Sequence, residues 1–156
     1  MEEASEKSFD HAWRYFELHA QQRMTVFNFY LFLIGLVAAG IAASIQAGKN
    51  MALLGVFLGL LLAFISFIFW KLDQRVSFLL KFSESVMASL ESKLTSEASR
   101  LFHNEPIATT AARSTGNFLM RHWTYGRSFR LTFATAGTVG IMAAIFSLFR
   151  FMGMTN

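Results

Sequence analysis

The chain has 156 residues, of which 54% are apolar and only 15% carry a charge. A water-soluble domain has about 25% charged residues, so this composition argues against an ordinary soluble enzyme. The absence of cysteine excludes disulfides, cysteine-ligated metal centres and a thiol nucleophile. The net charge of +4 suits an anionic lipid surface or nucleic acid, and the positions of the charges must decide between them.

Residues 1 to 23 precede the first long apolar stretch, and an amphipathic helix is expected from residue 5 onward. Ser5 is a candidate N-cap, and Phe9, Trp13 and Phe16 recur at steps of three or four residues. Such a helix suits the membrane surface or a gating role. Packing against another helix of the same chain is the simpler explanation.

Two stretches without a charged residue follow, at positions 24 to 48 and 50 to 70. They contain 25 and 21 residues, and roughly 20 apolar residues suffice to cross the hydrocarbon core of a bilayer. The short connection between them predicts a transmembrane hairpin over residues 24 to 70. Buried helices of a soluble protein would need polar-faced helices to cover them, and too few residues remain for that.

One face of the first stretch is small or polar, with a single aromatic residue. Its members recur at steps of three and four: Thr25, Asn28, Phe32, Gly35, Ala39, Ala42 and Gln46. Such a stripe can line a water-filled pore when several copies form a ring, with Phe32 as an apolar constriction. It can also pack against the second span or a neighbouring copy, with Asn28 making an interhelical hydrogen bond. The sequence leaves both alternatives open.

The second stretch carries Gly55, Gly59 and Ala63 at four-residue steps. Small residues at this spacing allow two membrane helices to approach closely, so these three are predicted to be helix-packing residues.

Residues 71 to 130 are expected to form a helical region outside the membrane. No helix breaker occurs between Trp70 and Pro106, so the second span is predicted to continue as one helix to about His103. This helix would be a rod on the order of 80 Å long. Its apolar stripe comprises Leu72, Val76, Leu79, Val86, Leu90, Leu94 and Leu101.

Most charged residues of this rod, including Asp73, Glu84 and Glu91, are expected to lie off the apolar stripe. An apolar stripe in water must be covered, and neighbouring copies in a coiled-coil-like contact are the most available cover. The pattern therefore predicts a homo-oligomer.

A third stretch, at 131 to 149, holds 19 uncharged residues between Arg130 and Arg150, and predicts a span over residues 131 to 150. Thr132, Ala136 and Gly140, followed by Ala143 and Ser147, give it a small face that suits helix packing or competes for the pore-lining role. Just before this span, basic and aromatic residues alternate: Arg121, Trp123, Tyr125, Arg127 and Arg130. Beside a membrane span, such residues favour contact with anionic lipid headgroups over nucleic acid.

The basic residues also predict an orientation. Twelve of the fourteen lie in residues 1 to 23 and 71 to 130, whereas the hairpin loop and the C-terminal tail hold one each. Because positive charge stays on the cytoplasmic side, both of these segments are expected in the cytoplasm of a bacterial cell, with the loop and the C-terminus outside the inner membrane.

Catalysis has little support in the sequence, and the expectation is a protein that is not an enzyme and has neither cofactor nor metal. The three charge-free stretches contain no Asp, Glu, Lys, Arg or His, which argues against a pump or a coupled transporter. Arg14 and His19 fit the short Arg-to-His spacing of HEPN ribonucleases, a weak motif in a chain of this size. An RNase of that type is kept as a third hypothesis.

The order of a short amphipathic helix, a two-span hairpin and a long helix resembles the SLATT class of small bacterial membrane proteins. The resemblance covers residues 5 to 103, with Tyr15 to Tyr30 as its most distinctive stretch, and the third span departs from that plan. The chain also resembles the membrane accessory proteins of RADAR and type VI-B CRISPR systems. The resemblance implies an oligomeric pore or membrane-perturbing effector that acts in antiphage defence.

The leading hypothesis is an all-α, homo-oligomeric inner-membrane protein that forms a pore gated by its cytoplasmic helices. The alternative is a membrane-anchored scaffold that recruits a soluble partner through the helix at residues 71 to 103, with Glu84 and Glu91 as contacts.

Overall fold

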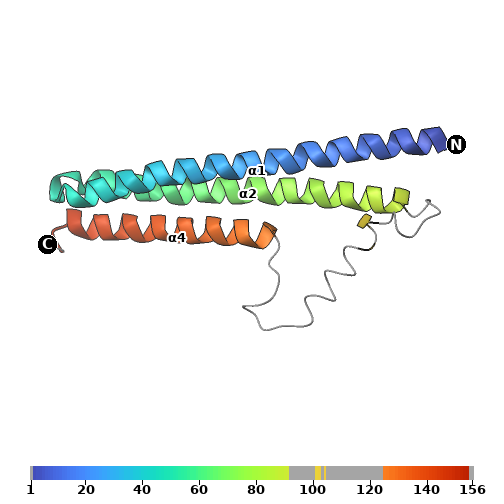
Figure 1. Ribbon diagram of the computed structural model, residues 1–156. Helices are drawn as coiled ribbons and strands as arrows, with labels where there is room; N and C mark the ends of the chain where they lie inside the picture. Colours follow the sequence, from blue (N-terminus) through green and yellow to red (C-terminus); the bar gives the residue numbers. More distant parts are fainter. Residues whose placement is uncertain (1, 92–100, 103, 105–124, 155–156) are drawn as a thin grey trace. The chain divides into compact units, whose positions relative to one another are not determined.

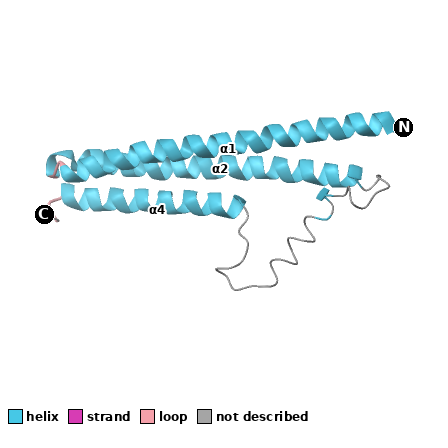
Figure 2. Cartoon of the chain, in the orientation of Figure 1, coloured by secondary structure: helices cyan, strands magenta, loops and turns pink. Residues whose placement is uncertain are grey.

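The computed structural model describes residues 2 to 91, 101 to 102, 104 and 125 to 154, with side chains from residue 6 onward. These residues are helical apart from two short turns (Figure 2). In chain order the elements are α1 (Glu2–Gln46), η1 (Lys49–Met51), α2 (Ala52–Glu91) and α4 (Tyr125–Phe151) (Figure 1). Three helices are long and apolar enough to cross a membrane, which confirms the predicted all-helical fold.

The turn between α1 and α2 depends on one glycine. Gly48 has a φ of 82°, a left-handed conformation that costs glycine little and other residues more. The backbone amide of Met51 donates a 3.2 Å hydrogen bond to the carbonyl of Gly48, which starts η1. This tight connection places the two apolar helices side by side as a hairpin, as the sequence predicts.

The helices contribute to two compact units, which are described separately. Unit 1 comprises Met1–Arg23 and Arg75–Tyr125, and unit 2 comprises Met24–Gln74 and Gly126–Asn156. On α1 the boundary falls at Met24, where the charge-free stretch begins. Unit 2 therefore holds the three apolar stretches, and unit 1 holds most of the charged residues.

The core of unit 2 is aromatic at the end near Met24, the first residue of α1 that belongs to this unit. Tyr30, Phe129 and Phe133 are buried together, and the rings of Tyr30 and Phe133 meet edge to face at 4.7 Å between centroids. Phe27 of α1 stacks on Phe129 of α4 at 3.9 Å. Further along, Val37, Ile41 and Leu62 form a second cluster between α1 and α2. The two clusters join all three helices of the unit.

In unit 1, α2 turns a partly polar face inward. Ser83 and Met87 are buried, whereas Val86 is exposed. The Ser83 hydroxyl donates to the carbonyl of Leu80 at 2.8 Å, so a small side chain can be buried there without an unpaired donor. The apolar stripe predicted for this helix is therefore not its buried face, and α1 packs instead along the serine-containing side.

Two acidic residues lie off the apolar stripe, as expected, but on the face of α2 that is buried. Asp73 and Glu91 are both buried, and Glu91 is only 2% exposed. The backbone amide of Phe102 donates a 2.9 Å hydrogen bond to the Glu91 carboxylate. Each carboxylate thus has a partner inside its unit.

The same hydrogen bond overturns the prediction of one unbroken helix from Asn50 to His103. In a continuous helix Glu91 and Phe102 would lie about 16 Å apart along the axis, beyond the reach of a glutamate side chain. The Phe102 ring instead packs against Trp13 and Phe16 of α1, at 6.2 and 5.8 Å between centroids. The predicted positions between 92 and 100, including Leu94, lie outside the described residues.

The N-terminal cap predicted at Ser5 is also wrong, because α1 already begins at Glu2. Amphipathic spacing located the helix correctly, but it could not place its first turn.

Candidate functional site

The stripe predicted on the first span is exposed along its whole length. Every member from Thr25 to Gln46 has an exposed side chain or, at Gly35, an exposed backbone, and Phe32 is 71% exposed. A Cβ added at Gly35 would meet nothing within 4 Å. The stripe therefore does not pack against α2, so one of the sequence alternatives is excluded. Pore lining and contact with a neighbouring copy both remain open.

The exposed faces of the other two apolar helices are different. Around the middle of its apolar segment, α2 exposes large side chains such as Phe57, Leu60 and Phe64, which suit lipid tails. On α4 the exposed hydroxyls of Thr135 and Thr138 are satisfied by helix carbonyls, at 2.8 and 2.6 Å. Within the apolar stretches of α2 and α4, each exposed polar side chain that the structure describes therefore has a hydrogen-bond partner.

The exposed side chain of Asn28 on α1 is different. Among the residues that the structure describes, its side-chain amide has no hydrogen-bond partner. An amide facing lipid tails without a partner costs several kcal/mol, on the order of the desolvation penalty of a polar group. The geometry therefore favours water or a second protein surface opposite Asn28.

The glycines predicted for helix packing bring α2 and α4 into backbone contact. A Cβ added at Gly59 would lie 2.6 Å from the carbonyl oxygen of Gly140 and 2.7 Å from the amide nitrogen of Ala144. A Cβ added at Gly140 would meet the Gly59 oxygen at 2.7 Å and the Ala63 nitrogen at 2.8 Å. Gly55 is equally tight, against the hydroxyls of Ser147 and Ser44.

The remaining members of the small face of α4 lie in the same interior. Ser147 is buried, and Thr132, Ala136 and Ala143 are half-buried. The Thr132 hydroxyl donates to the carbonyl of Ser128 at 3.0 Å. Because this face is taken up within the subunit, α1 presents the small and polar face that stays available.

Arg130, predicted to contact lipid headgroups, has a protein partner. Its Nε lies 3.8 Å from Oδ2 of Asp73, whose side chain is 4% exposed against 47% for the arginine. At the opposite end of unit 2, Arg150 donates a hydrogen bond to the carbonyl of Ile45. Tyr125 and Arg127 are exposed, as headgroup contact requires, and Arg121 and Trp123 lie outside the described residues.

The Asp73–Arg130 pair gives an asymmetric prediction for stability. Arg130→Gln leaves a buried carboxylate short of its cation and should cost about 2 kcal/mol, whereas Asp73→Asn removes the buried charge itself and should cost about 1 kcal/mol. Melting temperatures in detergent would check the order. Arg127→Gln, an exposed arginine one turn away, should leave the melting temperature unchanged, and equal losses in the first two variants would contradict the assignment.

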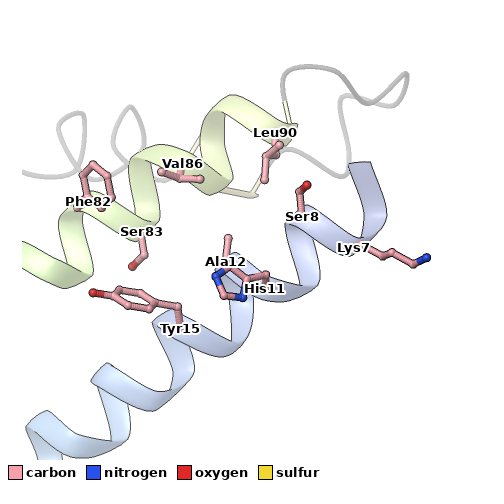
Figure 3. Close-up of a pocket in the computed structure, with 9 residues that line it drawn as sticks. All are labelled: Lys7, Ser8, His11, Ala12, Tyr15, Phe82, Ser83, Val86 and Leu90. Carbon is pink, nitrogen blue, oxygen red and sulfur yellow. The ribbon is translucent and has the colours of Figure 1, made fainter. Parts of the chain in front are cut away.

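A groove in unit 1 was not indicated by the sequence. A space of about 640 Å³ between α1 and α2 is lined on one side by Lys7, Ser8, His11, Ala12 and Tyr15 and on the other by Phe82, Ser83, Val86 and Leu90 (Figure 3). One wall is mainly polar and the other mainly apolar. No motif marks these residues, because the groove arises only when two segments about 70 positions apart pack together.

The residues of the nuclease hypothesis are not arranged around a common site. Arg14 is exposed, and Nδ1 of His19 lies 2.7 Å from the carbonyl oxygen of Tyr15 on the same helix. The imidazole also contacts the Tyr15 ring in a tilted arrangement, at 4.1 Å between centroids. These contacts hold His19 against its own helix.

A model of the octameric membrane protein family (8xMP) matches residues 6–153. The chain is 44% identical over 149 residues to CD-NTase-associated protein 19 of Escherichia coli, which covers 93% of each chain. No solved structure matches.

The family match includes all three apolar helices and the exposed face of α1. It differs from the SLATT resemblance that the sequence suggested, while the oligomeric and membrane-spanning character that was expected is shared. The chain therefore belongs to the octameric membrane protein family and is a multi-pass membrane protein that assembles with copies of itself.

Proposed function

We propose that this protein forms a ring-shaped pore in the membrane, with the exposed stripe of α1 facing the inside of the assembly. The observation that carries the proposal is the difference between helix faces in unit 2. Among the described residues, α1 exposes a stripe of small and polar side chains along its whole apolar segment. Apart from Ala134, Thr135 and Thr138 of α4, the exposed side chains of α2 and α4 are mainly large and apolar, and these two helices pack glycines against each other.

The stripe has the chemistry of a narrow water-filled passage. Polar side chains stand toward its ends, with Thr25 and Asn28 at one and Gln46 at the other, and small residues lie between them. Phe32 supplies an exposed ring near Asn28, where an apolar constriction can close a pore by excluding water. Three helices of one subunit cannot enclose such a passage, so the activity depends on oligomeric assembly.

The orientation follows from the basic residues. The N-terminus and residues 71 to 130 would lie in the cytoplasm of a bacterium, with the Gly48 turn and the C-terminus outside. Exposed Tyr125 and Arg127 at the start of α4 would then meet the anionic headgroups of the inner leaflet. Labelling of single engineered cysteines at the Gly48 turn from either side of intact cells would check this topology.

The name of the Escherichia coli relative supports a role beside a CD-NTase. The pore would open in antiphage defence, gated by the helices of unit 1 in response to a signal or partner. A protein that permeabilises its own membrane needs such control, and unit 1 is the water-exposed part of the chain on which a signal can act.

A scaffold remains the second candidate, favoured by one observation. Phe78 and Phe82 of α2, one helical turn apart in unit 1, are 67% and 59% exposed. Exposed aromatic residues of this kind suit a protein partner. The contact cannot use Glu91 as the sequence suggested, because that side chain is buried.

The pore is tested by Asn28→Leu in purified protein reconstituted into liposomes. If Asn28 faces the lumen, ion leakage should change about tenfold while the octamer stays intact, because an apolar side chain of similar size replaces a polar lining group. Thr138→Val is the matched control, since it removes a polar group from an exposed site on α4 whose hydroxyl is already satisfied.

Other outcomes decide between the hypotheses. Octamers of the wild-type protein that never leak ions would overturn the pore and favour the scaffold. Loss of the octamer in Asn28→Leu would assign the stripe to packing between copies.

A further inference from the structure

The part of α1 in unit 1 exposes two edges of opposite charge. The exposed residues on one side are Glu6, Asp10, Trp13 and Glu17, here called the acidic edge. Those on the other side are Lys7, Arg14 and Leu18, here called the basic edge. On the side of the helix that faces away from both edges, Ala12 is buried and Phe16 is half-buried.

Helical geometry separates these residues cleanly. At about 100° per residue, the acidic edge spans roughly 60° of the helix circumference and the basic edge roughly 40°, with centres about 90° apart. Each edge also carries an exposed apolar side chain, Trp13 at 43% and Leu18 at 62%. Both edges therefore combine charge with apolar area, as interfaces between proteins do.

Pairing within the helix does not account for the charges of Asp10 and Arg14. Among the described residues, neither Asp10 nor Arg14 makes an ion pair, although they stand four positions apart. Glu17 accepts only a long hydrogen bond, 3.4 Å, from the amide of Gln21.

A closed ring of identical subunits needs two different surfaces that fit each other head to tail. In a ring of eight, each subunit sees its two neighbours about 135° apart. Two edges about 90° apart on one helix, extended by long Glu and Arg side chains, are suited to this arrangement. A two-fold contact, in contrast, would bring like charges together.

We propose that the acidic edge of one copy docks on the basic edge of the next copy and so sets the head-to-tail order of the ring. The partner is a second copy of this chain, argued from charge complementarity and from the octameric assembly of the family. The inference rests on the assembly part of the proposed function and is independent of ion conduction.

Complementation between subunits tests this contact. Arg14→Glu cancels the net positive charge of the basic edge and places a carboxylate opposite the acidic edge of the next copy. Glu17→Arg places a cation opposite the basic edge, so each variant alone should lower the octamer fraction about tenfold through local like-charge repulsion. Co-expressed at equal amounts, the two can alternate around the ring and should restore octamers. Native mass spectrometry of the detergent-solubilised full chain would measure both.

Rescue in trans separates this contact from an effect within one helix, because a pair inside α1 cannot be repaired by another subunit. Lys81→Glu, the same charge change at an exposed site on α2, should leave the octamer intact. Failure of the mixture to assemble, or full octamers from each variant alone, would overturn the proposal.

A second readout uses the absence of native cysteine. Treated with the thiol oxidant diamide, which accepts the two electrons and two protons, differently tagged Glu17→Cys and Leu18→Cys subunits should form disulfide-linked pairs with each other. Pairs formed only between identical variants would show a two-fold contact and overturn the head-to-tail order. Octamers that assemble head to tail but do not leak ions would contradict the pore alone.

Discussion

Gly59→Ala should destabilise the subunit by about 1 to 3 kcal/mol, although alanine is the better helix former. The added Cβ would lie 2.6 Å from the carbonyl oxygen of Gly140, a backbone atom that cannot swing aside as a flexible side chain can. α2 and α4 would have to separate along the whole contact. Gly140→Ala should have a similar effect, because its Cβ meets the Gly59 oxygen at 2.7 Å.

Gly35→Ala is the matched control for this prediction. Its Cβ would enter open space on the exposed side of α1, so only the propensity gain of up to about 1 kcal/mol should remain. Thermal unfolding in detergent, followed by circular dichroism, compares the three variants. A Gly59→Ala protein as stable as Gly35→Ala would show that the close approach of α2 and α4 does not hold the subunit together.

The contrast between Gly59 and Gly35 shows which features of the fold can be predicted from the sequence. Both glycines lie in apolar stretches and both fit small-residue stripes, so spacing alone assigns them similar roles. Only the packing of α4 against α2 reveals that Gly59 is internal and Gly35 external. The three spans were predictable because a bilayer excludes charged residues over a fixed length, a constraint that is readable in one dimension.

Predictions about unit 1 were less successful for a physical reason. On a water-exposed helix, charged residues are expected to point outward and leucines and valines to mark the covered face. Glu91 reverses this assumption, because the amide of Phe102 satisfies its carboxylate in the interior. A long-range hydrogen bond of this kind leaves no periodic signal, and the packing of Phe102 against α1 is equally invisible in the sequence.

The aromatic cluster of unit 2 belongs to the same class of features. Tyr30 appeared only as part of a distinctive stretch, yet it is fully buried and its hydroxyl lies 3.0 Å from Oγ of Ser66. Ser66 in turn donates to the carbonyl of Leu62 at 2.8 Å. A polar pair that is satisfied inside an apolar region depends on the meeting of two helices and cannot be read from either one.

Tyr30→Ala should therefore be among the most destabilising substitutions in the chain. It would remove a ring that contacts Phe69 at 5.0 Å and Phe133 at 4.7 Å between centroids, and so open a cavity where α1, α2 and α4 meet. Truncation of a buried aromatic residue costs about 3 to 5 kcal/mol. Tyr30→Phe keeps the ring and loses only the bond to Ser66, at about 1 kcal/mol.

Phe57→Ala provides the comparison, because it removes a ring of similar size from a side chain of α2 that is exposed. Its melting temperature in detergent should stay close to that of the unmodified protein, while Tyr30→Ala should fall furthest and Tyr30→Phe should lie between them. If Tyr30→Phe lost as much stability as Tyr30→Ala, the hydrogen bond to Ser66 rather than the aromatic packing would be the main link between α1 and α2. Equal behaviour of Tyr30→Ala and Phe57→Ala would contradict the burial of Tyr30 altogether.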